Sequence, residues 1–138
     1  DVFLTEINQY PIPLLKTRLL TDGGYWEEAN RQLATVNPSE LDGKWLCEYY
    51  YRLARLNHLQ GKDQSAIPHY RQALKLAERQ PWYMGANAAL QLGFIMKSSG
   101  KDKEAKGYFE KAMDFENHPY KASIDSSAER ELARLTSD

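Results

Sequence analysis

The sequence predicts an all-α fold, an α-α superhelix of about three helix pairs followed by a C-terminal capping helix. Two observations support this prediction. The stretch from Leu53 to Ala112 repeats itself at an offset of 39 residues, and glycines and prolines divide the rest into segments of helical length. Internal repeats of this size are typical of helix pairs that stack on one another.

The repeat is defined by small and aromatic residues at fixed spacing. Six positions in the first copy recur in the second: Leu53, Ala54, Gly61, Ala66, Tyr70 and Ala73 match Leu92, Gly93, Gly100, Ala105, Phe109 and Ala112. In each copy, alanine, aromatic and alanine stand at i, i+4 and i+7, which is one face of a helix. The alanines let a neighbouring helix approach closely, and the aromatic ring fills the space between them.

The order Leu-Gly, Gly, then Ala-x3-aromatic-x2-Ala resembles the tetratricopeptide repeat (TPR), and this resemblance implies a scaffold that binds a partner protein. The last 60 or so residues, Asn87–Phe115 with the tail Tyr120–Asp125, are further similar to the C-terminal end of a TPR family. That family has bacterial members and eukaryotic relatives linked to the mitochondrial outer membrane and to clearance of protein inclusions. The resemblance implies that the chain is the C-terminal part of a longer helical array.

Composition restricts the class of protein. The 138 residues suit a single TPR-like domain with its own core. A hydrophobic fraction of 42% with 27% charged residues is ordinary for a globular protein, and a net charge of −1 argues against a nucleic-acid binder. No apolar run approaches the length of a membrane span, so no membrane insertion is expected.

The chain begins Asp1-Val2-Phe3 without a methionine, and we interpret it as a trimmed or processed fragment. The lack of a signal peptide is therefore uninformative and no compartment is assigned. Cys47 is the only cysteine, so no internal disulfide is possible. We expect it to be a small buried hydrophobe.

The N-terminal part predicts a degenerate first repeat over residues 10–38. Leucines 14, 15, 19 and 20 suggest an amphipathic helix that ends at Asp22-Gly23-Gly24, and residues 25–36 suggest a second helix. Ala29, Leu33 and Val36 match the repeat face at an offset of 37 residues. Lys16-Thr17, however, stands where the pattern has leucine and glycine.

The later repeats are expected at 44–80 and 82–116, and the capping helix at 123–136. Asp63 and Asp102 are expected N-caps of the second helices, and Pro68 falls inside the first of these. The 39-residue period exceeds the common 34 by five residues. We expect these extra residues as extended helix ends around 78–84, with Trp82 covering the junction.

No constellation of residues indicates catalysis, a metal site or a cofactor. The stretch from Gly93 to Lys101 has six residues between its glycines where a phosphate-binding loop has four, and Asp102 replaces the required Ser or Thr. His58, His69 and His118 have no paired spacing. The sequence therefore predicts a protein that is not an enzyme.

The TPR resemblance also assigns a ligand groove, because the first helix of each TPR pair lines the concave surface at repeat positions 2, 5, 6, 9 and 12. With Cys47 and Ala86 at position 1, these are Glu48, Tyr51, Arg52, Arg55 and His58, then Asn87, Leu90, Gln91, Phe94 and Lys97. The family's carboxylate clamp uses Lys and Asn at positions 5 and 9. Tyr51 and Arg55 stand there, so that clamp is not carried over.

Arg52, Arg55 and Lys97 supply positive charge to this groove, and Tyr51, Leu90 and Phe94 supply apolar area. The mixture predicts binding of an extended or helical protein segment with some acidic character, with no nucleic acid and no cofactor. Two alternatives remain open. Tyr51 or Phe94 packs beneath the N-terminal or the capping helix, or the chain is a self-assembly or intramolecular docking module, with a homo-oligomer formed through its N-terminal end.

Overall fold

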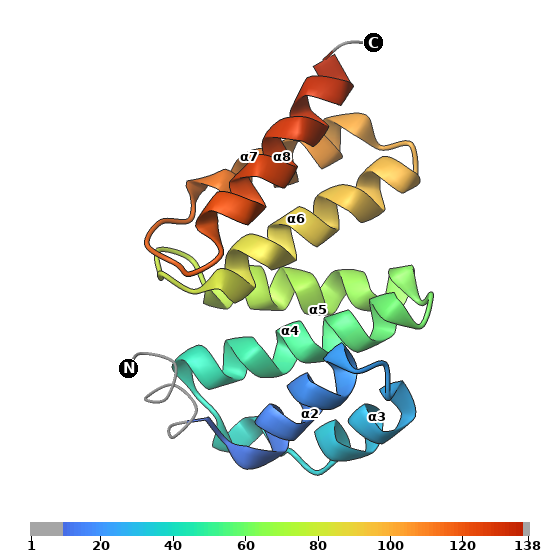
Figure 1. The fold of residues 1–138 in the computed structure, drawn as a ribbon, viewed down its shortest axis with the longest axis vertical. Coiled ribbons are helices and arrows are strands. Elements are labelled where there is room, and N and C mark those ends of the chain that lie inside the picture. Colours follow the sequence, from blue (N-terminus) through green and yellow to red (C-terminus); the bar gives the residue numbers. More distant parts are fainter. Residues whose placement is uncertain (1–9, 137–138) are drawn as a thin grey trace.

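A computed structural model describes residues 10–136, and within that range the chain forms seven α-helices and one short 3-10 helix, with no strand (Figure 1). The helices are α2 (Ile12–Asp22), α3 (Trp26–Ala34), α4 (Gly43–Leu59), α5 (Asp63–Leu76), α6 (Tyr83–Ser98), α7 (Asp102–Asp114) and α8 (Lys121–Thr136), and the 3-10 helix η1 covers Pro38–Glu40. The all-α prediction is confirmed.

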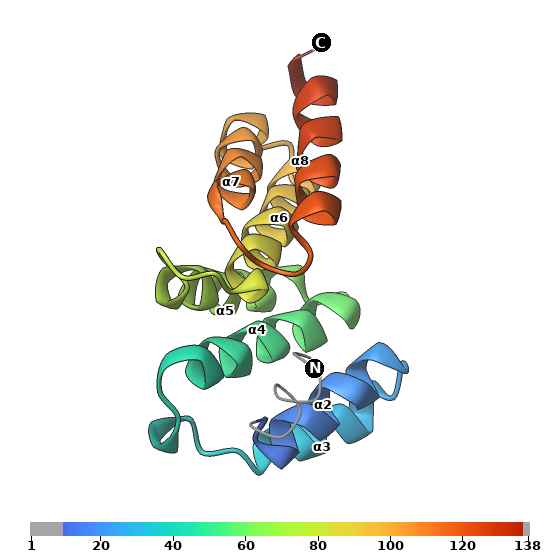
Figure 2. The ribbon, with the colours of Figure 1, turned by 60° about the vertical axis from the view of Figure 1, so that its left-hand side comes forward.

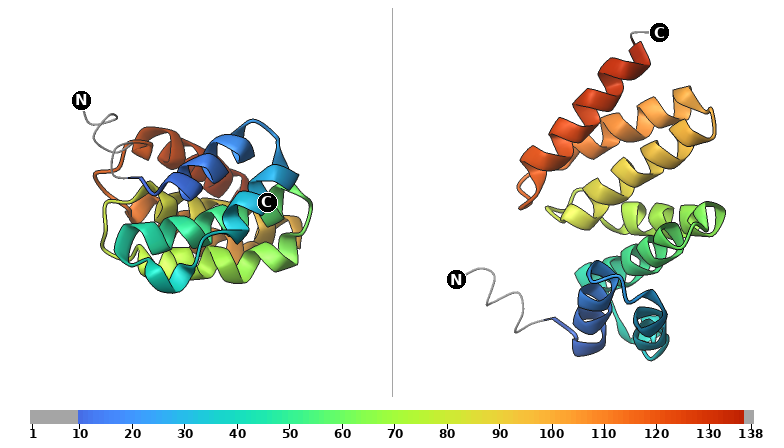
Figure 3. Two further views of the ribbon diagram at one scale, coloured as in Figure 1. Left: turned by 90° about the horizontal axis from the view of Figure 1, so that it is seen from below. Right: turned by 45° about the vertical axis from the view of Figure 1, so that its right-hand side comes forward.

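The helices form three antiparallel pairs, α2–α3, α4–α5 and α6–α7, and α8 packs against α6 and α7 (Figures 1 and 2). The pairs follow one another along the long axis of the molecule, as Figure 3 shows from the side. This is the helical superhelix that the repeat predicts.

The repeated small and aromatic residues form the interfaces between helices. Tyr70 and Phe109 are fully buried, as are the alanines that flank them in the repeat. Gly93 lies directly against Phe109: a Cβ atom added to Gly93 would come within 2.4 Å of the Phe109 Cε1 atom. In the second copy of the repeat, the glycine after the leucine therefore allows the Phe109 ring to contact the backbone of α6.

The turns within the second and third pairs depend on glycine. Gly61 and Gly100 have φ angles of 79° and 75°, in the left-handed region that favours glycine. The expectation that Asp63 and Asp102 are N-caps is wrong. The N-cap residues are Lys62 and Lys101, whose amides bond back to the preceding helix, so each aspartate is already the first helical residue. There its carboxylate still favours the positive end of the helix dipole.

The extra residues of the 39-residue period do not extend the helices, which corrects our expectation. Helix α5 ends at Leu76 and α6 begins at Tyr83, so an ordered turn fills the interval. Arg79 has a φ angle of 64°, which no α-helix accommodates, and Pro81 disfavours a helical residue before it. Trp82 packs against the core, as expected for a residue covering this junction.

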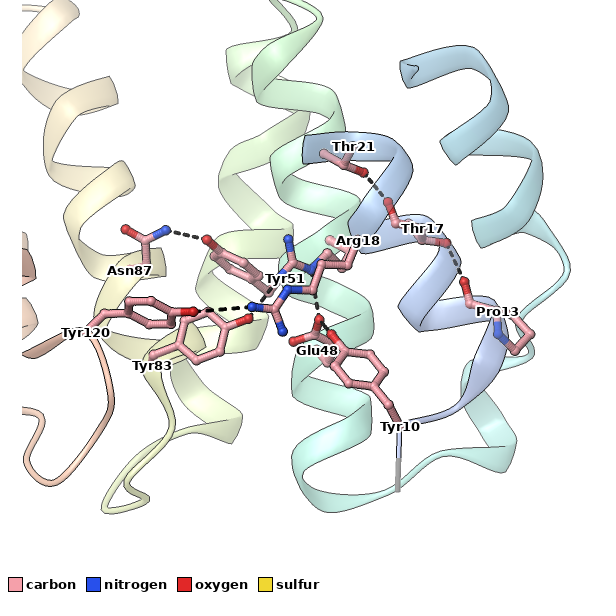
Figure 4. Close-up of polar contacts among 11 residues, drawn as sticks. Tyr10, Pro13, Thr17, Arg18, Thr21, Glu48, Tyr51, Tyr83, Asn87 and Tyr120 are labelled. Atoms are coloured by element: carbon pink, nitrogen blue, oxygen red, sulfur yellow. Dashed lines mark hydrogen bonds and ion pairs between the residues drawn. The ribbon is translucent and has the colours of Figure 1, made fainter. Parts of the chain in front are cut away.

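The first pair, α2–α3, stacks like the later two, but its core differs in composition. Thr17, which matches Ala54 and Gly93 in the repeat, is fully buried. Its hydroxyl donates to the Pro13 carbonyl at 2.7 Å, and that of Thr21 donates to the Thr17 carbonyl at 2.6 Å (Figure 4). Because both hydroxyls are satisfied within α2, they can face the core.

The prediction that the leucines of α2 form its buried face is wrong in part. Leu14 is buried, but Leu19 is 62% exposed, because the buried face runs through Leu14, Thr17 and Thr21 instead. The first pair and its contacts with α4 form a hydrophobic cluster separate from the main one.

Helix α8 has the two faces of a capping helix. Ile124 and Ala128 are buried against the preceding pair, with Leu132 and Leu135 partly buried beside them. Glu129, Arg130 and Arg134 are exposed on the other side. The carboxylate of Glu131 connects this helix to α6 by accepting a hydrogen bond from Lys97.

Candidate ligand groove

Helices α2, α4, α6 and α8, with the residue that precedes α8, line one cavity of about 270 Å3, which we call the four-helix cavity. Each first helix of a pair contributes to it, and Figure 4 shows polar side chains from α2, α4 and α6, together with Tyr120, converging there. The lining residues are Arg18, Asp22, Tyr51, Arg52, Arg55, Tyr83, Asn87, Tyr120, Ser123 and Ile124.

A buried ion pair lies at the base of this cavity. Arg52 Nε donates to Glu48 Oε1 at 2.8 Å, and Arg52 Nη2 donates to the Tyr83 hydroxyl at 2.8 Å. The Tyr10 hydroxyl also donates to Glu48 (Figure 4). Burial by itself would lower the pKa of Arg52, but the Glu48 carboxylate outweighs it and the pKa is raised. Arg52 therefore stays charged, and its hydrogen bond to Tyr83 ties α4 to α6.

Arg18 crosses the cavity from α2. Its guanidinium carbon lies 5.9 Å from the Tyr10 ring centroid and 5.6 Å from that of Tyr83, within the range of cation–π contacts. Arg18 Nη2 donates to the Tyr120 hydroxyl at 3.4 Å. The Tyr120 ring meets Tyr83 edge to face, with 4.9 Å between centroids. Two aromatic rings and the Tyr120 hydroxyl thus contact this side chain.

Arg55 and His58 lie one turn apart on α4, beside the Tyr70 hydroxyl. His58 Nδ1 is 2.9 Å from that oxygen. Burial lowers the pKa of His58, against the opposing effect of Asp63, so this ring is neutral at pH 7. Burial also raises the pKa of Tyr70, which keeps its hydroxyl protonated. Arg55 is therefore the charged group on this side of the cavity.

The structure divides the ten groove residues expected from the sequence into two sets. Glu48, Tyr51, Arg52 and Leu90 are buried, whereas Arg55, His58, Asn87, Gln91, Phe94 and Lys97 are partly exposed. Tyr51, Arg52, Arg55 and Asn87 line the four-helix cavity. Ligand contact by any of the ten stays a prediction.

Tyr51 and Phe94 both pack within the fold. Tyr51 accepts a hydrogen bond from Asn87 and lies against the rings of Tyr70 and Tyr83. Phe94 meets Phe109 of α7 edge to face, with 5.5 Å between centroids. Packing against the core therefore accounts for much of the area of both rings.

Sequence reasoning missed six cavity residues: Arg18, Asp22, Tyr83, Tyr120, Ser123 and Ile124. A signal for one was present, because Arg18 precedes Arg55 by 37 residues, the offset of the degenerate repeat. Tyr120 carried no such signal. Its place depends on the curvature of the whole superhelix, which local spacing does not encode.

A larger cavity of about 670 Å3 lies at the α5–α6 turn and the end of α7, where Arg79 and Lys111 alternate with Glu78, Asp114 and Glu116. No group of three His, Cys, Asp or Glu side chains among residues 10–136 is placed to hold a metal ion. None of the described helices has the length and apolarity to cross a membrane.

Cys47 is fully buried, as expected, and its thiol lies 3.3 Å from the Ala73 carbonyl oxygen. Burial raises its pKa to about 12. The thiolate is the reactive form of cysteine, so this side chain is inert at pH 7.

Stacked antiparallel helix pairs, whose first helices share one cavity, define an α-helical repeat scaffold. The tetratricopeptide repeat family model matches residues 45–115, which is just over half of the chain and spans α4 to α7. The chain therefore belongs to the tetratricopeptide repeat family. Proteins of this family generally mediate protein–protein interactions and are typically not enzymes.

No curated protein and no solved structure matches the chain. The narrower similarity of the last 60 or so residues to one TPR family therefore stays a prediction, as do the repeat boundaries outside residues 45–115.

Proposed function

We propose that this chain is a non-catalytic scaffold that binds an acidic segment of a partner protein along α4 and α6, without a cofactor. The observation that carries the proposal is the lining of the four-helix cavity, where three arginines and three tyrosines converge. Arginine and tyrosine are the residues most enriched at the energetic centres of protein interfaces.

The partly exposed residues of α4 and α6 extend this surface beyond the cavity. Arg55 supplies positive charge, Lys97 shares its charge with Glu131 of α8, and Asn87 and Gln91 supply amide groups for hydrogen bonds to a backbone. Gln91 Nε2 already lies 3.4 Å from Asn87 Oδ1, so the two amides form one polar strip along α6. A segment with acidic side chains complements both features.

A peptide selection tests the proposal. The wild-type protein is used to select binders from a random-sequence peptide library, and we expect enrichment of peptides rich in Asp and Glu. A groove variant, Arg55→Glu with Gln91→Glu, should lose this enrichment, because it places two carboxylates on the binding face. The matched control, Arg130→Glu with Gln64→Glu, makes the same charge change on exposed residues of α8 and α5.

The control variant should keep the selected peptides, and circular dichroism should show the same helix content for all three proteins. Equal binding by the groove variant and the wild type would place the ligand elsewhere. Selection of peptides without acidic bias would contradict the proposed chemistry.

The second candidate is a self-assembly or docking module, and exposed apolar residues of the first pair favour it. Ile12, Leu19 and Tyr25 are each more than 60% exposed, and Trp26 is 37% exposed. Light scattering after size exclusion separates the candidates. A mass that rises with concentration and falls in a Leu19→Glu variant supports assembly, whereas a constant monomer mass excludes homo-oligomerisation.

A further inference from the structure

We propose that Arg18 and Arg55 form a two-arginine subsite of the four-helix cavity, which binds one carboxylate side chain of the partner segment. The inference rests on the proposed function and adds a specific recognition element to it. The subsite joins α2, which lies outside the region matched by the family model, to α4 within it.

The first observation is that these two arginines lack a carboxylate partner although they are partly buried. Arg31, Arg52 and Arg134 pair with Glu27, Glu48 and Glu131. Arg18 and Arg55 make no ion pair with any residue in 10–136. Three other arginines also make no ion pair within this range, but they are exposed to solvent: Arg71, Arg79 and Arg130. A partly desolvated cation without a counter-charge is costly, and a bound anion removes that cost.

The second observation is the charge balance around the cavity. Arg18, Arg52 and Arg55 contribute three positive charges, and Asp22 with the buried Glu48 contributes two negative ones. One positive charge is in excess, which a single carboxylate neutralises. Asp22 is exposed, so solvent weakens its effect on the two arginines.

The third observation is that aromatic side chains lie beside both arginines before any ligand arrives. The Tyr10 and Tyr83 rings hold the Arg18 guanidinium, and Arg55 lies beside the buried Tyr70. A guanidinium in a fixed position loses little entropy when it binds. Its planar set of N–H donors also matches the two oxygens of a carboxylate.

Nuclear magnetic resonance of the arginine side chains tests the subsite. The probe is the peptide acetyl-Gly-Ala-Glu-Ala-Gly-amide, and its counterpart with glutamine in place of glutamate is the control ligand. We expect the glutamate peptide to shift the Nε–Hε signals of Arg18 and Arg55, and the shifts to diminish at high salt. The glutamine peptide should bind about tenfold more weakly, since it lacks the charge.

Three single variants separate a ligand contact from a structural role. Arg18→Gln and Arg55→Gln should each weaken binding of the glutamate peptide about tenfold, and Arg130→Gln on the outer face of α8 should leave it unchanged. Tyr120→Phe removes the hydroxyl that Arg18 contacts but keeps the ring. It should change the affinity less than twofold or so, because the tyrosine rings still hold Arg18.

A Tyr120→Phe variant as weak as Arg18→Gln would mean that Arg18 acts through Tyr120 and not on the ligand, which overturns the subsite. Equal shifts with the glutamate and glutamine peptides, or none with either, also overturn it. If the library still yields acidic peptides that depend on Arg55 and Gln91 while Arg18→Gln binds normally, the subsite fails and the proposed function stands. Loss of the acidic enrichment itself refutes the proposed function.

Discussion

Arg18 on α2 donates a hydrogen bond to the hydroxyl of Tyr120, which lies 102 residues further along the chain and directly precedes α8. Both side chains also contact the Tyr83 ring of α6. Helix α2 is therefore connected to the residue that precedes α8 (Figure 4). All three of these side chains line the four-helix cavity.

The interface between α6 and α7 should depend on Phe109. This ring is fully buried and lies against Gly93 and Phe94. Phe109→Ala should reduce the free energy of unfolding by about 3–5 kcal/mol, as for other buried aromatics cut to alanine. Urea denaturation followed by circular dichroism measures this loss. A loss below about 1 kcal/mol would show that the ring contributes little to the interface.

Two glycines of the same helix pair should respond in opposite directions. In Gly93→Ala the new Cβ atom would meet the Phe109 ring at 2.4 Å, so overpacking should cost about 1–3 kcal/mol. A Cβ atom at Gly107 has no neighbour within 4 Å, so Gly107→Ala should stabilise α7 by about 0.5–1 kcal/mol. The same denaturation experiment measures both. Equal effects of the two variants would contradict the close approach at Gly93.

The repeat made the fold predictable, because its 39-residue offset fixed which faces of α4 to α7 are buried. The interval between α5 and α6 was not predictable. Pro81 disfavours a helical residue before it but is tolerated at the start of a helix, so the sequence still allowed extended helix ends. The left-handed backbone of Arg79 makes the interval a turn. Such a φ angle is rare for a residue other than glycine, and no sequence pattern marks it.

The groove was predicted less completely than the fold. Four of the ten family positions, Tyr51, Arg52, Arg55 and Asn87, line the four-helix cavity. They did not show that Glu48 and Arg52 are buried, because this burial comes from Tyr10 and Tyr83, which are outside the repeat motif. A polar residue is buried only when other side chains cover it, and here those side chains come from segments distant in the sequence.

The free energy of unfolding should fall in acid because the Glu131 carboxylate becomes protonated. Burial by itself would raise the pKa of this carboxyl, but the hydrogen bond from Lys97 outweighs it and the pKa is lowered. A carboxyl with a lowered pKa in the folded state stabilises the fold at neutral pH, and this contribution is lost as pH falls through the folded-state pKa. Thermal melts between about pH 7 and pH 3 of wild type and Glu131→Gln test this.

The wild type should melt higher than Glu131→Gln at neutral pH, and the difference should disappear in acid. Glu129→Gln, an exposed position on the same helix, should match the wild type throughout. A difference that persists unchanged at the lowest pH would mean that the ion pair with Lys97 does not stabilise the folded state.

Removal of the capping helix should expose the core of the third pair. Deletion of residues 121–138 uncovers the surface that Ile124 and Ala128 bury. We expect a lower melting temperature and aggregation, since terminal helices of repeat proteins keep the last interface from water. The control is Glu129→Ala with Arg130→Ala, which changes only the outer face of α8. An unchanged melting temperature after the deletion would show that α8 is not a cap.

The first helix pair should open locally more often than the rest of the chain. Among residues 10–136 its hydrophobic cluster has five buried residues, Tyr10, Leu14, Ala29, Leu33 and Leu56, whereas α4 to α8 share a larger one. Segments with few buried apolar contacts open at lower free energy. Amide hydrogen exchange in α2 and α3 should therefore be faster than in α4 to α7.

Addition of the glutamate peptide should slow hydrogen exchange in α2. A carboxylate bound by both Arg18 and Arg55 links α2 to α4, and it can do so only while the first pair is folded against α4. In Arg18→Gln the same peptide should leave the exchange in α2 unchanged. Uniform protection from α2 to α7 would show instead that the first pair unfolds only together with the rest of the superhelix.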